Sequence, residues 1–151
     1  MKNNRQTVVR GIIILLALTG AALYLLLGSV SASVGKDSIT VSGTLSEDVT
    51  VRYSDIQTFE LHSRMDLGTC SFGLTTRRIC TGRYSSPVYG LYHLFIYRNV
   101  NKLIMLKTAD TVVIFNCASE EETVKCFDEI SARIQKLVAE NAPQKESPQG
   151  S

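Results

Sequence analysis

Four cysteines, Cys70, Cys80, Cys117 and Cys126, are the side chains in this 151-residue sequence best suited to covalent chemistry. Outside the reducing cytoplasm an even number of cysteines permits disulfides, and four cysteines allow three pairings. Cys70 and Cys80 are the candidate disulfide, since a bridge there would tie a Gly- and Thr-rich loop to the next strand. Free thiols that pack as small hydrophobic residues are the alternative. The spacings include no CxxC pair, so no metal site is expected.

The other two cysteines straddle the expected start of a helix and are nine positions apart. A helix would hold residues at that spacing about 10 Å or more apart along its axis. Because a disulfide needs Cα atoms within about 7 Å of each other, a bridge between Cys117 and Cys126 is expected to be strained.

Three arginines close together in the sequence, Arg77, Arg78 and Arg83, are the candidate site for an anionic ligand such as a lipid headgroup or a wall polymer. The alternative is that these arginines are solvated strand residues, paired with acids such as Glu60 or Asp66. The net charge of +2 is too small to indicate nucleic-acid binding.

The sequence holds no constellation typical of an enzyme. His62 and His93 lie on strand-like segments, where a packed or surface role is more common than catalysis. Cys117 precedes an expected helix N-terminus, which can lower the pKa of a thiol, but a thiol nucleophile also needs a base and an oxyanion site. Serine elbow, phosphate-loop and paired-acid motifs are missing from the sequence. We therefore expect neither catalytic activity nor a cofactor.

Residues 8–30 form an apolar run whose one charge, Arg10, lies near its start. A helix needs about twenty apolar residues to cross the hydrocarbon core of a bilayer. The apolar region of a signal peptide is only about 7–15 residues long, which favours an uncleaved transmembrane anchor. Cleavage after Ser33, at the small residues Ser31-Ala32-Ser33, is the alternative.

The charges on either side of this run predict its orientation in the cell membrane. Lys2, Arg5 and Arg10 lie on the N-terminal side with no acid among them, whereas Lys36 on the other side is followed by Asp37. Because the more cationic flank stays in the cytoplasm, we expect a cytoplasmic N-terminus and an extracytoplasmic C-terminal domain.

Amino-acid composition divides the rest of the chain into a folded domain and a polar C-terminal tail. The C-terminal residues are polar and rich in Pro, Gly and Ser, so they are expected to be disordered. The remaining residues suffice for one compact domain with its own core. The expected segments are a cytoplasmic N-terminus (1–7), a transmembrane helix (8–30), a linker (31–37), a folded domain (38–140) and a disordered tail (141–151).

Within the folded domain, alternating apolar and polar residues predict a mainly β structure of about seven antiparallel strands in a meander. A capping box at Ser119–Glu122, followed by apolar residues at three- and four-residue spacing, predicts a C-terminal amphipathic helix that ends before Pro143. The expected strands are 38–42, 48–53, 55–61, 76–84, 90–97, 103–108 and 111–116, and 67–74 is expected to be a long, ordered loop.

This order of elements resembles the bacterial pleckstrin-homology-like (PH-like) domain family of small membrane proteins. The similarity covers most of residues 34–138. The resemblance implies a bent barrel capped by one helix and an association with a membrane, and it brings no activity. The motifs that carry it are Tyr53-Ser54-Asp55-Ile56, Asp66-Leu67-Gly68-Thr69, Phe72-Gly73, Thr81-Gly82-Arg83-Tyr84, Tyr89-Gly90, residues 108–113 and residues 119–123.

Inositol-lipid binding is not expected from this resemblance. PH domains that bind inositol phosphates usually use lysines and arginines around the first hairpin, but the hairpin loop 43–48 carries two acids and no base. We instead expect a non-catalytic docking module, anchored by one span, for an envelope protein or peptide. Docking would occur by strand addition at a sheet edge or in a groove between helix and sheet. A sensor of an anionic envelope ligand is the alternative.

Overall fold

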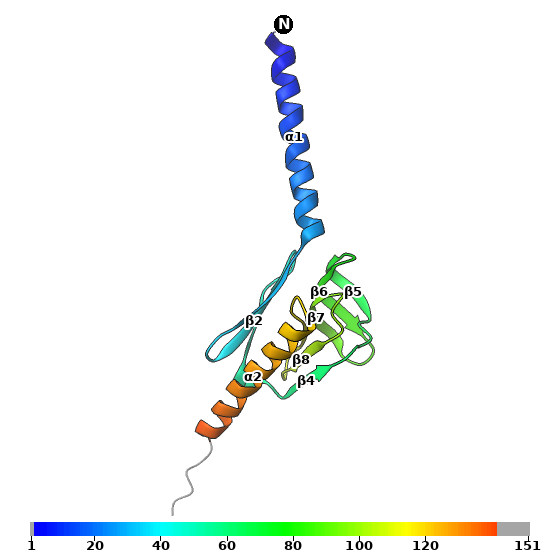
Figure 1. Ribbon diagram of the computed structural model, residues 1–151. Coiled ribbons are helices and arrows are strands. Elements are labelled where there is room, and N and C mark those ends of the chain that lie inside the picture. Colours follow the sequence, from blue (N-terminus) through cyan, green and yellow to red (C-terminus); the bar gives the residue numbers. More distant parts are fainter. Residues whose placement is uncertain (1, 142–151) are drawn as a thin grey trace, which may run out of the picture.

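The computed structural model describes residues 2–141 of the chain (Figure 1). The tail expected to be disordered therefore lies, from Ala142 on, outside the described residues. Two sheets lie beside a C-terminal helix, and a long N-terminal helix projects away from them. The elements in chain order are α1 (Lys2–Leu27), β1 (Val30–Val34), β2 (Ser38–Gly43), β3 (Val49–Arg52), the 3₁₀ turn η1 (Tyr53–Asp55), β4 (Thr58–His62), β5 (Thr69–Thr75), β6 (Ile79–Ser86), β7 (Gly90–Tyr97), β8 (Leu103–Lys107), β9 (Val112–Phe115) and α2 (Glu120–Asn141).

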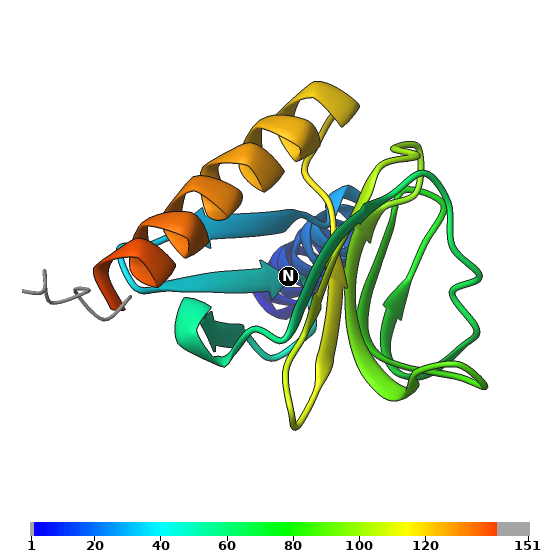
Figure 2. The same cartoon turned by 90° about the horizontal axis from the view of Figure 1, so that it is seen from below.

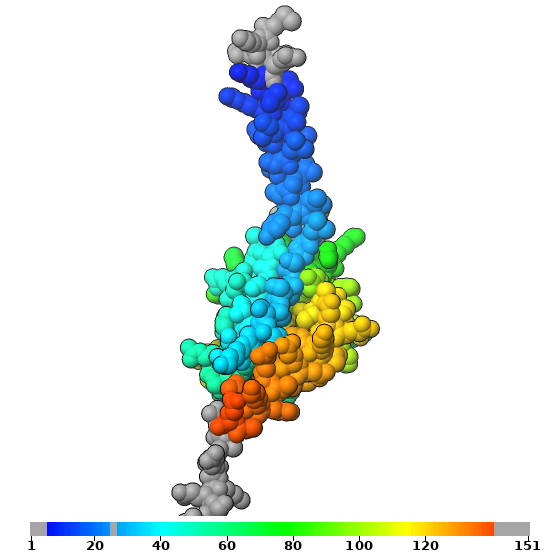
Figure 3. Space-filling model, turned by 60° about the vertical axis from the view of Figure 1, so that its left-hand side comes forward, coloured from blue at the N-terminus to red at the C-terminus, as the bar shows by residue number. Residues whose placement is uncertain are grey.

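Helix α1 contains one stretch, Gln6–Tyr24, that is long and apolar enough to cross a membrane. None of this stretch is buried against the rest of the protein. The space-filling view shows the helix standing free of the folded part (Figure 3). A membrane span and a signal anchor share this length and composition.

The first sheet has three antiparallel strands in the order β1-β2-β3. Strands β2 and β3 form the first hairpin that alternation predicted. The expected linker, 31–37, is wrong for most of its length, because β1 pairs along β2 from Val30 opposite Gly43 to Val34 opposite Ile39. Strand β1 has the sequence Val30-Ser31-Ala32-Ser33-Val34, in which only the two valines are β-branched, so its strand signal is weak.

The second sheet has six strands in the order β4-β8-β9-β7-β6-β5. The expected purely antiparallel meander is wrong here, since β9 lies between β8 and β7 and runs parallel to β7. All four residues of β9 are buried. A strand that is apolar on both faces is suited to a central position with both faces covered. Residues 2–141 contain nine strands rather than the expected seven, because β1 and β5 form in segments expected to be linker and loop.

The main core lies between the two sheets and α2, as the view in Figure 2 shows. Helix α2 begins with the predicted cap: the backbone N–H of Glu122 donates to Ser119 Oγ at 3.1 Å. Its apolar face buries Ile130 and stacks Phe127 on Phe59 of β4, with ring centroids 4.4 Å apart. The predicted amphipathic helix is therefore confirmed, with its stripe facing the core.

A second core covers the outer face of the six-stranded sheet. Residues 63–68 cross that face between β4 and β5 and pack Met65 and Leu67 onto it. The Tyr92 hydroxyl donates to the Leu67 carbonyl. Burial raises the pKa of Tyr92 to about 12, so the hydroxyl remains a hydrogen-bond donor at ordinary pH.

Candidate functional site

The structure divides the three arginines of the predicted anionic site between two places. Arg77 and Arg78 lie in the turn between β5 and β6, which comes next to the end of α1. The Arg78 guanidinium donates to the Leu27 carbonyl at 3.4 Å and lies 5.9 Å from the Tyr97 ring centroid. Figure 3 shows this turn, in green, projecting on the side of α1.

A fourth arginine, Arg98, joins this turn. Its guanidinium donates to the Thr76 carbonyl at 3.0 Å, and its backbone N–H donates to the Arg78 carbonyl at 2.8 Å. The Thr76 hydroxyl accepts from the backbone of Arg78 and Ile79 and fixes the turn. We call Arg77, Arg78 and Arg98 the turn arginines. Arg98 follows β7, about twenty residues after the β5–β6 turn, so the sequence alone did not indicate that these three arginines lie together.

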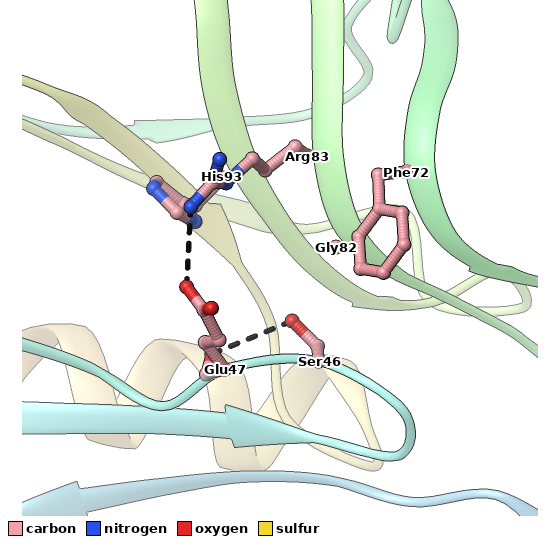
Figure 4. A pocket seen from close by; sticks show the side chains of 6 residues that line it. All are labelled: Ser46, Glu47, Phe72, Gly82, Arg83 and His93. Carbon is pink, nitrogen blue, oxygen red and sulfur yellow. Dashed lines mark hydrogen bonds and ion pairs between the residues drawn. The ribbon is translucent and has the colours of Figure 1, made fainter.

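Arg83 lies elsewhere, in a groove between the β2–β3 loop and the strands β5, β6 and β7 (Figure 4). This groove has a volume of about 230 Å³. Arg83 donates to the carboxylate of Glu47 at 3.2 Å, so one acid of the first hairpin faces the sheet. The six residues that line the groove are Ser46, Glu47, Phe72, Gly82, Arg83 and His93.

The register of the sheet places His93 beside Arg83. The two are cross-strand partners on β6 and β7, and the His93 ring stacks on Phe95 at 6.4 Å between centroids. Partial burial, followed by the charge of Arg83, lowers the pKa of His93. At neutral pH the groove therefore holds a neutral imidazole beside one guanidinium.

Sequence reasoning missed Glu47 and His93 as partners of Arg83. These residues lie 36 and 10 positions from Arg83 along the chain. The pairing of β6 with β7 brings His93 to Arg83, whereas Glu47 reaches Arg83 from the β2–β3 loop of the other sheet. The acids Glu60 and Asp66, suggested as alternative partners for the arginines, lie elsewhere: Glu60 bonds His62 at 2.9 Å, and Asp66 accepts from the backbone of Gly68.

The groove lies beside an edge strand. β5 ends the order of the six-stranded sheet, and six of its seven residues are exposed. Phe72, at the middle of β5, is 71% exposed, although aromatic side chains of a domain this size are mostly covered. An exposed sheet edge is a place where an extended peptide can add a further strand.

The structure does not bring Cys70 and Cys80 together. All four cysteines are free thiols, with Cys70 exposed and Cys80 buried. Cys70 is opposite Tyr84 and Cys80 is opposite Thr75, so four residues of β6 separate the two levels. Four residues of a strand span about 13 Å, which is beyond the reach of a disulfide. The expected bridge does not fit this register.

Cys117 and Cys126 are the cysteines that meet. Cys117 precedes α2 rather than lying on it, and it packs partly buried against the apolar cluster that contains Cys126. The helix does not hold these two cysteines apart as expected, because the chain turns at Ala118 and Ser119 before α2 begins at Glu120. In residues 2–141 no group of three His, Cys, Asp or Glu side chains is placed to hold a metal ion.

Comparisons of this chain with protein-family models, with curated proteins and with solved structures find no match.

Proposed function

We propose that this chain is a single-pass membrane protein whose extracytoplasmic PH-like domain docks an extended acidic peptide from another envelope protein. The cationic flank of the apolar run supports the orientation. Two sheets with a C-terminal helix against their shared core support a PH-like arrangement. The extra strands β1 and β5 and the parallel pairing of β7 with β9 depart from the expected seven-stranded antiparallel barrel. The observation that carries the docking proposal is that the open edge of β5 lies beside the Arg83 groove.

The backbone of β5 supplies the first part of the interaction. An edge strand presents unpaired N–H and C=O groups, and an added strand satisfies them while its alternate side chains point to one face. A strand laid beside β5 would place those side chains along the rim formed by Phe72. The irregular register between Cys70 and Phe72 limits pairing to the C-terminal part of the strand.

Arg83 supplies the second part, because its present partner is easily replaced. The Arg83–Glu47 ion pair is solvent-exposed, with side chains 57% and 79% exposed. Exposed ion pairs contribute about 0–1 kcal/mol. A carboxylate of the docked peptide can therefore take the place of Glu47 at small cost.

Selection from a library of random peptides displayed on phage tests this proposal. The target is the full chain in lipid nanodiscs. We expect the enriched peptides to carry an acid within an extended apolar sequence. Phe72→Ser and Arg83→Ser should each weaken their binding about tenfold or more, because one removes the apolar rim and the other the charge.

Arg77→Ser is the matched control, since it removes an arginine from the turn and leaves the groove intact. Binding to this variant should stay within about twofold of the parent. Enriched peptides that bind Phe72→Ser and Arg83→Ser as well as the parent would rule out this docking site.

A second candidate function is anionic-headgroup binding by the turn arginines. The observation that favours it is the hydrogen bond from Arg78 to the Leu27 carbonyl, which holds the turn at the end of the apolar helix. Leu45, 58% exposed, lies next to Thr44, whose backbone N–H bonds the Ser29 carbonyl at the same end. Guanidinium groups beside an apolar side chain suit a surface that rests on phospholipid headgroups.

A single tryptophan at Leu45 can report this contact, because the chain has no tryptophan of its own. We expect Leu45→Trp fluorescence to be quenched more by brominated phosphatidylglycerol than by brominated phosphatidylcholine. Adding Arg77→Ser and Arg78→Ser should remove the preference. Arg52→Ser is the control, because Arg52 pairs with Ser38 at the opposite end of the first sheet. Equal quenching by the two lipids would contradict headgroup binding.

A further inference from the structure

The cysteine pair at the start of α2 is not used by either proposed function. After β9 the chain turns so that Cys117 lies over the first turn of α2, and its backbone N–H donates to Thr123 Oγ1 at 3.0 Å. Thr123 is fully buried, and its hydroxyl donates to the Ser119 carbonyl at 2.7 Å. These bonds hold Cys117 against the helix at a fixed place.

Cys126 lies three positions after Thr123, which is on the same face of the helix. It belongs to the main core, at 9% exposure, and Cys117 packs partly buried against that core. Each thiol is the largest cause of the other's pKa shift, which is downward for Cys117 and upward for Cys126. The start of α2 therefore brings the two thiols to one place at the edge of the main core.

We propose that Cys117 and Cys126 are an oxidation site, at which a disulfide-bearing oxidant closes an intramolecular bridge between the end of β9 and helix α2. The bridge would fasten the helix that covers the main core to the central strand of the six-stranded sheet. The inference concerns the chain's own chemistry and does not depend on the proposed docking function.

Cys117 is the attacking sulfur of this site. The hydrogen bond from Cys126 lowers the pKa of Cys117 and raises that of Cys126, so the thiolate forms at Cys117. Cys117 is also the less buried of the two, which lets an oxidant approach it. The Cys126 thiol lies behind it, in the position of a resolving group.

The reaction takes two thiol–disulfide exchanges. Cys117 first releases its proton to the solvent, and its thiolate attacks one sulfur of a small-molecule or protein disulfide. The other sulfur leaves as a thiolate, which takes up a proton from the solvent. The Cys126 sulfur then attacks Cys117 in this mixed disulfide, displaces the second thiol and gives up its own proton. The two cysteines lose two electrons and two protons in total, and the oxidant is reduced to two thiols.

Thiol counting on the full chain in detergent micelles tests this site with oxidised glutathione as the probe. After denaturation, a maleimide reagent of high mass should label all four cysteines of the reduced chain and two fewer after oxidation. Proteolysis and mass spectrometry should recover a peptide pair that links Cys117 to Cys126. Oxidation should also raise the midpoint of thermal unfolding, and a reductant should restore the original value.

Two double variants give matched controls. Cys70→Ser with Cys80→Ser should still lose two thiols on oxidation, whereas Cys117→Ser with Cys126→Ser should lose none. The peptide pair is read on the unmutated chain, so the test holds even if a buried substitution prevents folding. Four reactive thiols after oxidation, or a linked pair that contains Cys70 or Cys80, would overturn the proposal.

Discussion

Asn116→Leu is expected to lower the free energy of unfolding by about 3 kcal/mol or more. The Asn116 side chain is fully buried at the end of β9, next to the last residue of β7. Its oxygen accepts from the Tyr97 N–H at 2.7 Å, and its amide nitrogen donates to the carbonyls of Tyr97 and Val100. Leucine has the same branched shape and the same number of side-chain heavy atoms, but it leaves these backbone groups without their partner.

Thermal unfolding of the full chain, followed by circular dichroism of its β structure, measures this loss. A change of this size should lower the midpoint by about 10 °C or more. Asn101→Leu is the control, because the exposed Asn101 side chain only donates to Glu120 at the surface, and its effect should stay near 0.5 kcal/mol. Similar losses for the two variants would show that Asn116 does not hold the β7 end in place.

Gly82→Ala should also destabilise the domain, by about 2–4 kcal/mol. Gly82 and Gly73 are cross-strand partners on β6 and β5, and both have positive φ, at +125° and +140°. A methyl group on Gly82 would lie 2.7 Å from the Gly73 Cα and closer still to the Phe72 carbonyl. The backbone of β5 must move away, which changes the groove as well as the sheet edge.

Hydrogen exchange followed by mass spectrometry localises this effect. In Gly82→Ala, peptides from β5 and β6 should exchange faster, and those from β8 and β9 should change less. Gly90→Ala is the control: its φ is +66°, but a methyl group there meets nothing within 4 Å, so only the conformational cost of about 1 kcal/mol applies. If Gly90→Ala destabilises as much as Gly82→Ala, the close approach of the two strands is not the cause.

The elements that local pattern could predict are those whose periodicity is strong. The helix at Glu120–Asn141 carries both a cap and a continuous apolar stripe. In the β2–β3 hairpin apolar and polar residues alternate, and the two apolar strands of the β8–β9 hairpin are joined by a polar turn. By contrast, β1 and β5 consist mainly of small and polar residues. Such strands form because neighbouring strands offer hydrogen-bond partners, and this is a property of the sheet rather than of the segment.

The candidate site could be predicted only as a list of residue types. Arginines 77, 78 and 83 look like one cluster in the sequence, but β6 places Arg83 in the groove and leaves the other two at the turn. For the cysteines the sequence misled in the opposite way, because a pair that was expected to be held apart lies together. Spacing favoured Cys70 with Cys80, whereas the turn before α2 brings Cys117 to Cys126.

The sequence by itself determined an apolar run long enough to cross a membrane, a mainly β domain behind it and a capped C-terminal helix. These features follow from length, alternation and helical spacing, which act over a few neighbouring residues. Only the tertiary structure decided that β9 lies between β7 and β8, that Glu47 meets Arg83 and that Cys117 meets Cys126. Those contacts join segments distant in the chain, and they are decided by which apolar faces must be buried together.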